Sequence, residues 1–288
     1  MNTRMNLYRA ARQVLAESDS AAKQAGAARL WGQWQANELD ASADFETPID
    51  VAGIPDRPLL APANRMPRRQ LNGPENHAAL IHALAHIEFN AINLALDAVQ
   101  RFPGLPTEFY ADWLRVAAEE AYHFSLLRDH LRSLGKDYGD FPAHAGLWEM
   151  AEKTAHDPLA RMALVPRLLE ARGLDVTPDI QRKLRGYGDA AGADILNINL
   201  RDEIGHVAAG DRWFRYLCAQ RGLQPEVAFQ TLLATPGVPW PRRPFNETAR
   251  LAAGFSAAEL AMLDRGKNPA NSDTHIANHS CPGGPGRA

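Results

Sequence analysis

The sequence predicts an all-α protein, and three observations support this fold class. Apolar residues recur at intervals of three and four along several long stretches, as expected for helices with one buried face. No segment shows the sustained alternation of β-branched residues that a half-buried strand requires. The chain has 288 residues, 45% of them apolar and 23% charged, so it is long enough to bury a sizeable core and has a globular composition.

The first part of the chain, residues 1–70, is expected to form an N-terminal arm that is partly helical and partly extended. Residues 7–15 and 21–35 carry apolar side chains at helical spacing, so we expect two helices here. Residues 48–74 contain many prolines and few periodic apolar positions, which is typical of an extended segment wrapped on a surface.

Two long helices should follow this arm. The first begins near Pro74, because proline suits the first turn of a helix, and runs to about Gln100. The second begins with Thr107 as the N-cap and ends at Leu134, just before a glycine that stops the helix. Residues 137–143 are then expected to form an irregular crossover.

The second half of the chain predicts another pair of core helices. After a short helix over residues 147–154, a long helix should span residues 157–173 and be kinked by Pro166. Thr177 then begins a further helical stretch. The fourth core helix covers roughly residues 191–220.

Two shorter helices are predicted near the C-terminus, over residues 225–233 and 256–264. The second begins with a serine and a glutamate at the spacing of a capping box. Residues 71–265 are therefore expected to form one helical bundle with C-terminal additions. Residues 266–288 are polar and rich in glycine and proline, so we expect a disordered tail.

Two Glu-x-x-His motifs indicate metal chemistry. Because residues at i and i+3 share a helix face, Glu120 with His123, and Glu203 with His206, can each reach one metal ion. One such motif is weak evidence, but each has a glutamate on the preceding long helix, 32 or 33 residues earlier. This is the ligand order of di-iron and di-manganese carboxylate bundles. The predicted ligands are Glu88, Glu120, His123, Glu170, Glu203 and His206.

The residues around each predicted ligand support its assignment to different degrees. Glu88 lies at the centre of an apolar helix face, where a carboxylate is costly unless it is paired or bound to a metal. Glu170 is the weakest member, because Arg167 three residues earlier offers a plain salt bridge instead. Asp202 is a candidate to accept the second ring N–H of a metal-bound histidine, with a solvated aspartate as the alternative. His130 is a candidate to line the pocket, with a hydrogen-bonded core histidine as the alternative.

Several stretches of the chain resemble a family of bacterial ferritin-like proteins known only as a domain of unknown function. The resemblance covers about residues 70 to 265 and implies a ferritin-like four-helix bundle with one long crossover. It is carried by LIHALAHIEFNAINLALDAVQRFPGLP, ADWLRVAAEEAYHFSLLRDHL, YGDFPAHAGLWEMAEKTAHDPLARMALVPRLLEARGLDVTP and DEIGHVAAGDRWF.

More distantly, the chain is similar to di-iron oxygenases, including the tRNA-modifying hydroxylase and the small subunit of ribonucleotide reductase. On that pattern Glu88 and Glu170 are terminal ligands, Glu120 and Glu203 bridge the metals, and each histidine binds one metal. Asp202 matches the aspartate that those enzymes place before the second motif. Leu127 stands where the reductase carries its radical tyrosine, which argues against a tyrosyl radical at this position.

The expected function is that of a dinuclear metal protein, with two iron ions or alternatively Mn/Mn or Mn/Fe. The leading hypothesis is an O₂-activating oxidase or hydroxylase that acts on an unknown substrate and receives electrons from an unidentified donor. One alternative is a non-enzymatic iron-binding protein, and the other is a metal-free scaffold in which Arg or His pairs with the carboxylates. A homodimer is one assembly that we consider.

Charge and cysteine content exclude some other classes. The net charge is −3, so no basic excess indicates a nucleic-acid partner. The two cysteines, Cys218 and Cys281, lie far apart and form no CxxC motif, which favours a reducing cytoplasm. No run of about 18 consecutive apolar residues occurs, and the N-terminus has no secretory h-region, so no membrane span or export signal is expected.

Overall fold

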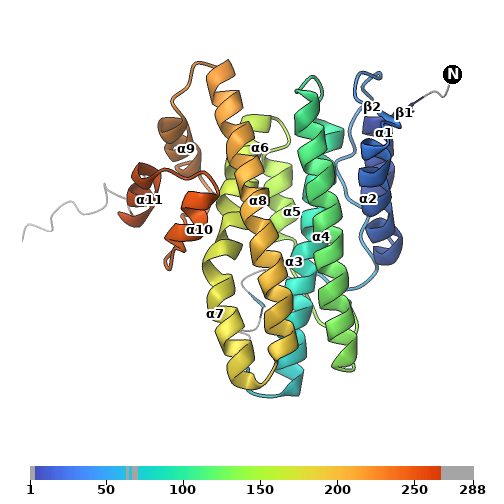
Figure 1. Ribbon diagram of the computed structural model, residues 1–288, viewed down its shortest axis with the longest axis vertical. Coiled ribbons are helices and arrows are strands. Elements are labelled where there is room, and N and C mark those ends of the chain that lie inside the picture. Colours follow the sequence, from blue (N-terminus) through green and yellow to red (C-terminus); the bar gives the residue numbers. More distant parts are fainter. Residues whose placement is uncertain (1–3, 63–64, 67–70, 267–288) are drawn as a thin grey trace, which may run out of the picture.

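The computed structural model describes residues 4–62, 65–66 and 71–266, and most of these residues are helical (Figure 1). The predicted all-α class is therefore confirmed. The strands that it describes are β1 Met5–Asn6 and β2 Leu39–Asp40, which pair in parallel near the N-terminus. The helices are α1 Leu7–Leu15, α2 Ser20–Gln35, α3 Pro74–Arg101, α4 Thr107–Ser133, α5 Gly146–Lys153, α6 Pro158–Leu164, the π-helix η2 Val165–Glu170, α7 Ala171–Tyr187, α8 Ala190–Gln220, α9 Pro225–Leu233, α10 Glu247–Ala252 and α11 Ala257–Asp264.

The long helices of the chain lie side by side and form the centre of the molecule (Figure 1). Helix α3 packs along α4, α7 packs along α8, and a contact between α4 and α8 joins the two pairs. The crossover between the pairs contains the short helix α5, which contacts α3. Leu114, Phe124 and Phe214 are among the fully buried side chains of the resulting core.

The third core helix differs from its prediction. It was expected to end at Gly173, but α6, η2 and α7 run on without a break to Tyr187. The kink predicted at Pro166 takes the form of a π-helical turn over Val165–Glu170. Proline has no N–H and its ring clashes with the preceding turn of an α-helix, so a wider turn accommodates it. Gly173 therefore does not end the helix, and this stretch packs against α8, where a Cβ atom on Gly173 would lie 3.6 Å from Oε1 of Glu203.

The N-terminal helices cover one side of α3 and α4 (blue in Figure 1). They bury polar residues of α3 that lie on the helix face away from Glu88. Asn93 accepts a hydrogen bond of 2.5 Å from the ammonium of Lys23, and that ammonium also donates to two backbone carbonyls. Asp97, on the same face, pairs at 2.6 Å with Arg161 of α6. The arm therefore covers apolar surface and satisfies part of a buried polar stripe, and α6 satisfies another part.

The C-terminal helices pack near α6 and the adjoining parts of α7 and α8. Helix α9 has the predicted bounds, and the capping box of α11 forms between Ser256 and Glu259 as predicted. Helix α10 was not predicted. Of the predicted tail, all residues beyond Gly266 lie outside the described residues.

Helix α3 is long and apolar enough to be tested as a membrane span. Among the described helices it alone meets the length and composition of a span, with a mean hydropathy of 1.3 over 18 residues. However, 67% of that window is buried inside the protein, where α1, α2 and α4 pack against it. This burial is what a core helix of a folded protein shows.

Candidate metal centre

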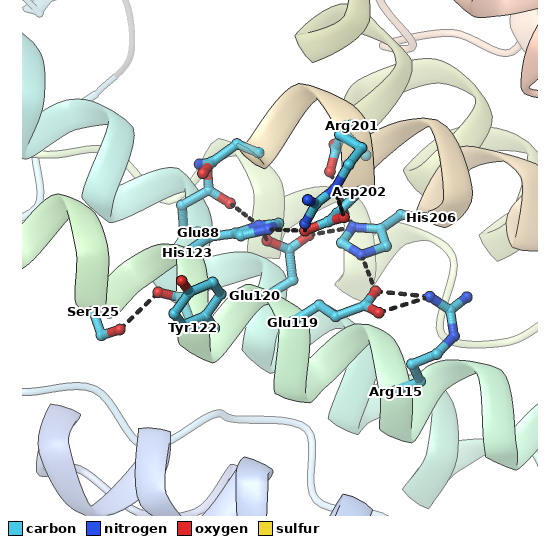
Figure 2. Close-up of polar contacts among 12 residues, drawn as sticks. Glu88, Arg115, Glu119, Glu120, Tyr122, His123, Ser125, Arg201, Asp202 and His206 are labelled. Carbon is cyan, nitrogen blue, oxygen red and sulfur yellow. Dashed lines mark hydrogen bonds and ion pairs between the residues drawn. The ribbon is translucent and has the colours of Figure 1, made fainter. Parts of the chain in front are cut away.

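Five of the six predicted ligands come together near the middle of α3, α4 and α8, and Figure 2 shows four of them, Glu88, Glu120, His123 and His206. Two overlapping groups have ligand atoms within 4.8 Å of one another, and Glu120 belongs to both. The groups are Glu88, Glu120 and His123, and Glu120, Glu203 and His206. The i, i+3 spacing places each Glu and His of a motif on the same side of its helix, and the packing of α4 on α8 brings the motifs together.

Glu120 occupies the central position between the two histidines. One of its carboxylate oxygens lies 3.2 Å from Nδ1 of His123, and the other lies 3.0 Å from Nδ1 of His206. Glu203 approaches the same Nδ1 of His206 at 3.0 Å. Glu88 lies 3.7 Å from Nδ1 of His123, and its other oxygen accepts a hydrogen bond of 2.9 Å from Asn199. Both imidazoles thus turn Nδ1 toward a shared carboxylate.

Glu170 reaches the centre from the last residue of the π-helix. It lines the same cavity as Glu88 and Glu203, although it is absent from the two closest ligand groups. Its Oε2 is buried and has no hydrogen-bond partner in the described part of the chain. Burial and the charges of Glu203 and Glu120 raise its pKa well above the ordinary value. An orphaned buried carboxylate oxygen beside other carboxylates is what a site for a cation provides.

The salt bridge considered as the alternative for Glu170 does not form. Arg167 is fully buried, but it pairs with Asp211 at 2.8 Å and with Glu259 at 2.5 Å. Two residues explain why Arg167 points away: the C-terminal helix α11 supplies Glu259, and α8 supplies Asp211. Among the described residues, Glu88, Glu120 and Glu203 form ion pairs with the two histidines and none with an arginine, and Glu170 forms no ion pair.

Each histidine is held from the other side by a second carboxylate (Figure 2). Nε2 of His123 lies 3.2 Å from Asp202, in the arrangement expected from the sequence. Nε2 of His206 lies 2.7 Å from Glu119, which the sequence analysis missed. The signal was present, because an acidic residue precedes each Glu-x-x-His motif. The pairing is crossed: the acid before one motif holds the histidine of the other.

Two arginines fix these outer carboxylates. Arg115 donates to both oxygens of Glu119 at 2.7 and 3.0 Å, and Arg201 donates to Asp202 at 2.8 and 3.0 Å. Such partners orient a ligating imidazole and set which ring nitrogen carries the proton. Because Nε2 faces a carboxylate acceptor in both rings, Nδ1 is the nitrogen left for the centre.

Burial and the neighbouring charges shift the pKa values of the carboxylates and histidines in the centre. Burial and the nearby charge of Glu120 raise the pKa of Glu88 to about 8. Burial lowers the pKa of His123, but Glu120 and Glu88 outweigh burial and raise that pKa to about 11. Burial raises the pKa of Glu120, yet His206 and His123 bring it well below the ordinary value. Protons thus balance the clustered carboxylates, which is a role that cations can take over.

His130 lies outside this centre, so its assignment as a residue beside the metal ligands is corrected, and the alternative of a hydrogen-bonded core histidine matches its contacts. It lies seven residues beyond His123, so the helix rise separates the two by about 10 Å. Its Nε2 instead lies 2.8 Å from Asp189, which also contacts His77 at 2.6 Å.

A cavity of about 240 Å³ opens onto the carboxylate side of the centre. Glu88, Glu170 and Glu203 reach its wall, whereas the side chains of His123 and His206 are fully buried on the other side. The rest of the wall is mainly aliphatic. Its aliphatic side chains include Leu84, Ile87, Leu94, Leu169, Val176, Ile180, Leu196 and Leu200. The centre is therefore open to an apolar molecule on one side and sealed on the other.

The chain belongs to a family whose function is not established. The family described as "Protein of unknown function (DUF455)" matches residues 16–261, which include every residue of the centre. An uncharacterized protein of Haemophilus influenzae is 50% identical over 241 residues, covering 81% of this chain and 84% of that protein. No solved structure matches the chain.

Proposed function

We propose that this member of the DUF455 family is a ferritin-like protein that holds two metal ions and uses them to activate dioxygen. The observation that carries the proposal is the position of Glu120, whose two oxygens each face Nδ1 of a different histidine. A carboxylate placed in this way is suited to bridge two ions, each bound by one histidine. The arrangement of α3, α4, α8 and the segment from α6 to α7 supports a ferritin-like bundle, in which such centres occur.

The ligands divide into two sets that share Glu120 and Glu203. His123 and Glu88 would complete one ion, and His206 and Glu170 the other, as the resemblance to di-iron proteins implies. Four carboxylates and two imidazoles are a donor set for iron or manganese, and we propose iron, with Mn/Mn or Mn/Fe as the alternatives. The unpartnered oxygen of Glu170 supports its assignment as a metal ligand, because in the described structure no hydrogen-bond donor satisfies it.

A ferrous pair would supply the electrons and the open coordination positions that dioxygen needs. The protein would bind the ions, orient the imidazoles through Asp202 and Glu119, and exclude water with the apolar wall of the cavity. For a hydroxylation, one oxygen atom enters a C–H bond and the other leaves as water. That balance requires two protons, taken from solvent, and two electrons, which the ferrous pair would deliver and a separate electron donor would then restore to the ions.

The cavity favours an enzyme over a protein that only binds iron. An iron-binding protein needs the ligands and a path for hydrated ions, and a path of this kind is polar. Here the wall beside Glu88, Glu170 and Glu203 is mainly aliphatic, which suits an uncharged organic substrate. We therefore place the substrate in this cavity, next to the carboxylate side of the centre.

Metal content tests the proposal first. The full chain is purified without chelator or affinity-tag metal, and metals are measured by mass spectrometry for the wild type and for Glu120→Ala/Glu203→Ala. Glu149→Ala/Glu247→Ala removes two exposed glutamates and is the matched control. We expect about two iron or manganese ions per chain in the wild type and the control, and a loss of both in the site variant.

Oxygen consumption then tests the activity. Protein loaded anaerobically with ferrous iron is mixed with dissolved O₂, and the rate of O₂ loss is followed with an electrode. The wild type should consume O₂ faster than Glu120→Ala/Glu203→Ala in the same iron solution. Absence of metal from the wild type after ferrous loading would overturn the dinuclear centre, whereas bound metal without O₂ consumption would overturn only the oxidase.

A further inference from the structure

A second cluster of side chains that could hold a metal ion lies at the end of the long helices, away from the dinuclear centre. His77 comes from the first turn of α3, His130 from the last turn of α4, and Asp189 from the turn between α7 and α8. These segments meet at the lower end of the molecule in Figure 1. The ligand atoms of the three side chains lie within 4.8 Å of one another.

The two imidazoles of this cluster approach the same carboxylate oxygen. Nε2 of His77 lies 2.6 Å from Oδ2 of Asp189, and Nε2 of His130 lies 2.8 Å from the same oxygen. The other oxygen, Oδ1, accepts a hydrogen bond of 2.7 Å from the backbone N–H of Gly192, so Asp189 is the N-cap of α8. The helix backbone thus holds the carboxylate, and Oδ2 remains directed at the two imidazoles.

The three side chains are buried, and Asp189 has no lysine or arginine partner among the described residues. The side chains of His77, His130 and Asp189 are only 7%, 10% and 6% exposed. A Cβ atom on Gly192 would overlap Asp189 and approach Nε2 of His130 to 3.0 Å, so the absence of a side chain there leaves room for the cluster. Among the described residues no lysine or arginine forms an ion pair with Asp189.

We propose that His77, His130 and Asp189 form a mononuclear site for a divalent transition-metal ion of the Zn²⁺ type, separate from the dinuclear centre. Two imidazole nitrogens and one carboxylate oxygen are a common donor set for such ions, with the fourth position left to water or another ligand. The ion would offset the buried negative charge of Asp189. It would also tie together the start of α3, the end of α4 and the turn before α8.

The distances require a small adjustment on binding. Tetrahedral bonds of about 2.0–2.1 Å place neighbouring donor atoms about 3.3 Å apart. The present separations of 2.6 and 2.8 Å between the imidazole nitrogens and Oδ2 are those of hydrogen bonds, so each of these two separations must lengthen by less than about 1 Å. The hydrogen bond from the Gly192 N–H to Oδ1 of Asp189 does not involve Oδ2, so it can remain while the imidazoles adjust.

Cobalt is the probe for this site, because tetrahedral Co²⁺ gives an intense visible absorption band. The full chain is stripped of metal and titrated with Co²⁺, as wild type, Asp189→Asn, His130→Gln and the control His156→Gln. Asparagine is also a good N-cap, so Asp189→Asn keeps the start of α8 while it removes the charged ligand. His156 is an exposed histidine outside the cluster.

We expect Asp189→Asn and His130→Gln each to bind one Co²⁺ fewer than the wild type, and to lose the tetrahedral band. His156→Gln should match the wild type. Glu120→Ala/Glu203→Ala should keep the band, so failure of the dinuclear centre and failure of this site give different results. In addition, Zn²⁺ should raise the melting temperature of Glu120→Ala/Glu203→Ala, and should not do so when Asp189→Asn is added.

Circular dichroism establishes that each variant is folded before titration. If folded Asp189→Asn and His130→Gln bind as much Co²⁺ as the wild type, with the same spectrum, the proposal is wrong. The same conclusion follows if no tetrahedral band appears with the wild type. The cluster would then be a hydrogen-bonded clamp at the end of the helices.

Discussion

Replacement of Arg167 by methionine should strongly destabilise the protein. Its guanidinium is fully buried and pairs with two carboxylates, Asp211 at 2.8 Å and Glu259 at 2.5 Å. Three aromatic rings also surround it. The guanidinium carbon lies 4.5, 4.2 and 4.8 Å from the ring centroids of Phe214, Phe229 and Phe255. Methionine keeps most of the side-chain length and removes the charge.

The size of the effect follows from these contacts. Removal of one member of a buried ion pair costs about 3–5 kcal/mol, because the partner is left uncompensated. A desolvated cation–π contact adds about 2 kcal/mol. Arg215 offsets part of this loss, since it also contacts Asp211 at 2.7 Å and Glu259 at 2.9 Å. We therefore expect the unfolding free energy to fall by about 4 kcal/mol, which lowers Tm by roughly 8–16 °C for a chain of this size.

Urea denaturation monitored by circular dichroism measures this change. Arg167→Lys keeps the charge but loses the planar contact with the rings, so it should fall between the wild type and Arg167→Met. Arg182→Met is the control, because Arg182 is 76% exposed and its ion pair with Asp179 should contribute less than about 1 kcal/mol. A loss below about 1 kcal/mol for Arg167→Met would refute the assignment of Arg167 as the buried link between α8 and α11.

Three further predictions concern the arm, the outer carboxylates and the cavity. Burial lowers the pKa of Lys23 to about 7, so between about pH 7 and 10 the unfolded chain binds more protons than the folded chain. The unfolding free energy of the wild type should therefore rise with pH in that window relative to Lys23→Met, as measured in urea. Asp202→Asn or Glu119→Gln should weaken metal binding about 10- to 100-fold in competition with a chelator, at unchanged helical content. Ile180→Trp should fill part of the cavity and reduce binding of the apolar fluorophore pyrene, while the metal content stays at that of the wild type.

Much of the helical framework could be predicted because its signals are local. Pro74 at the start of α3, and the capping pair Ser256 and Glu259 of α11, act within one turn of their helices. The same holds for the two Glu-x-x-His pairs, whose spacing alone places each pair on one helix face. Thr107 shows the limit of such signals, since it is already the first helical residue and makes no side-chain cap.

Other features depend on contacts between distant parts of the chain. The pairing of Glu119 with His206 joins residues 87 positions apart and arises only when α4 packs on α8. The π-helical turn at Pro166 also depends on packing, because a local pattern predicts a kink there without specifying its form. The choice between the two interpretations of His130 depended on packing for a related reason. His130 shares a helix face with His123, but it lies two turns further along α4, where it contacts Asp189 and not the metal centre.

Gly210→Ala provides a test of how the π-helical turn positions Glu170. In a helix interior this substitution is normally stabilising, by about 1 kcal/mol. Here the new Cβ would overlap Cβ and Cγ of Pro166, whose ring is fixed to the backbone and cannot rotate away. Overpacking of this kind costs about 1–3 kcal/mol, so we expect a net loss of stability.

The same overlap should disturb the metal centre, because Gly210 lies one turn after His206 and Pro166 lies one turn before Glu170. Separation of η2 from α8 moves Glu170 away from the ions, so Gly210→Ala should bind metal more weakly than the wild type. Gly205→Ala is the control in the same helix, since nothing lies within 4 Å of a Cβ there. It should be as stable as the wild type or more stable, with full metal content. If both variants behave alike in denaturation and in metal content, the contact of Gly210 with Pro166 does not set the position of Glu170.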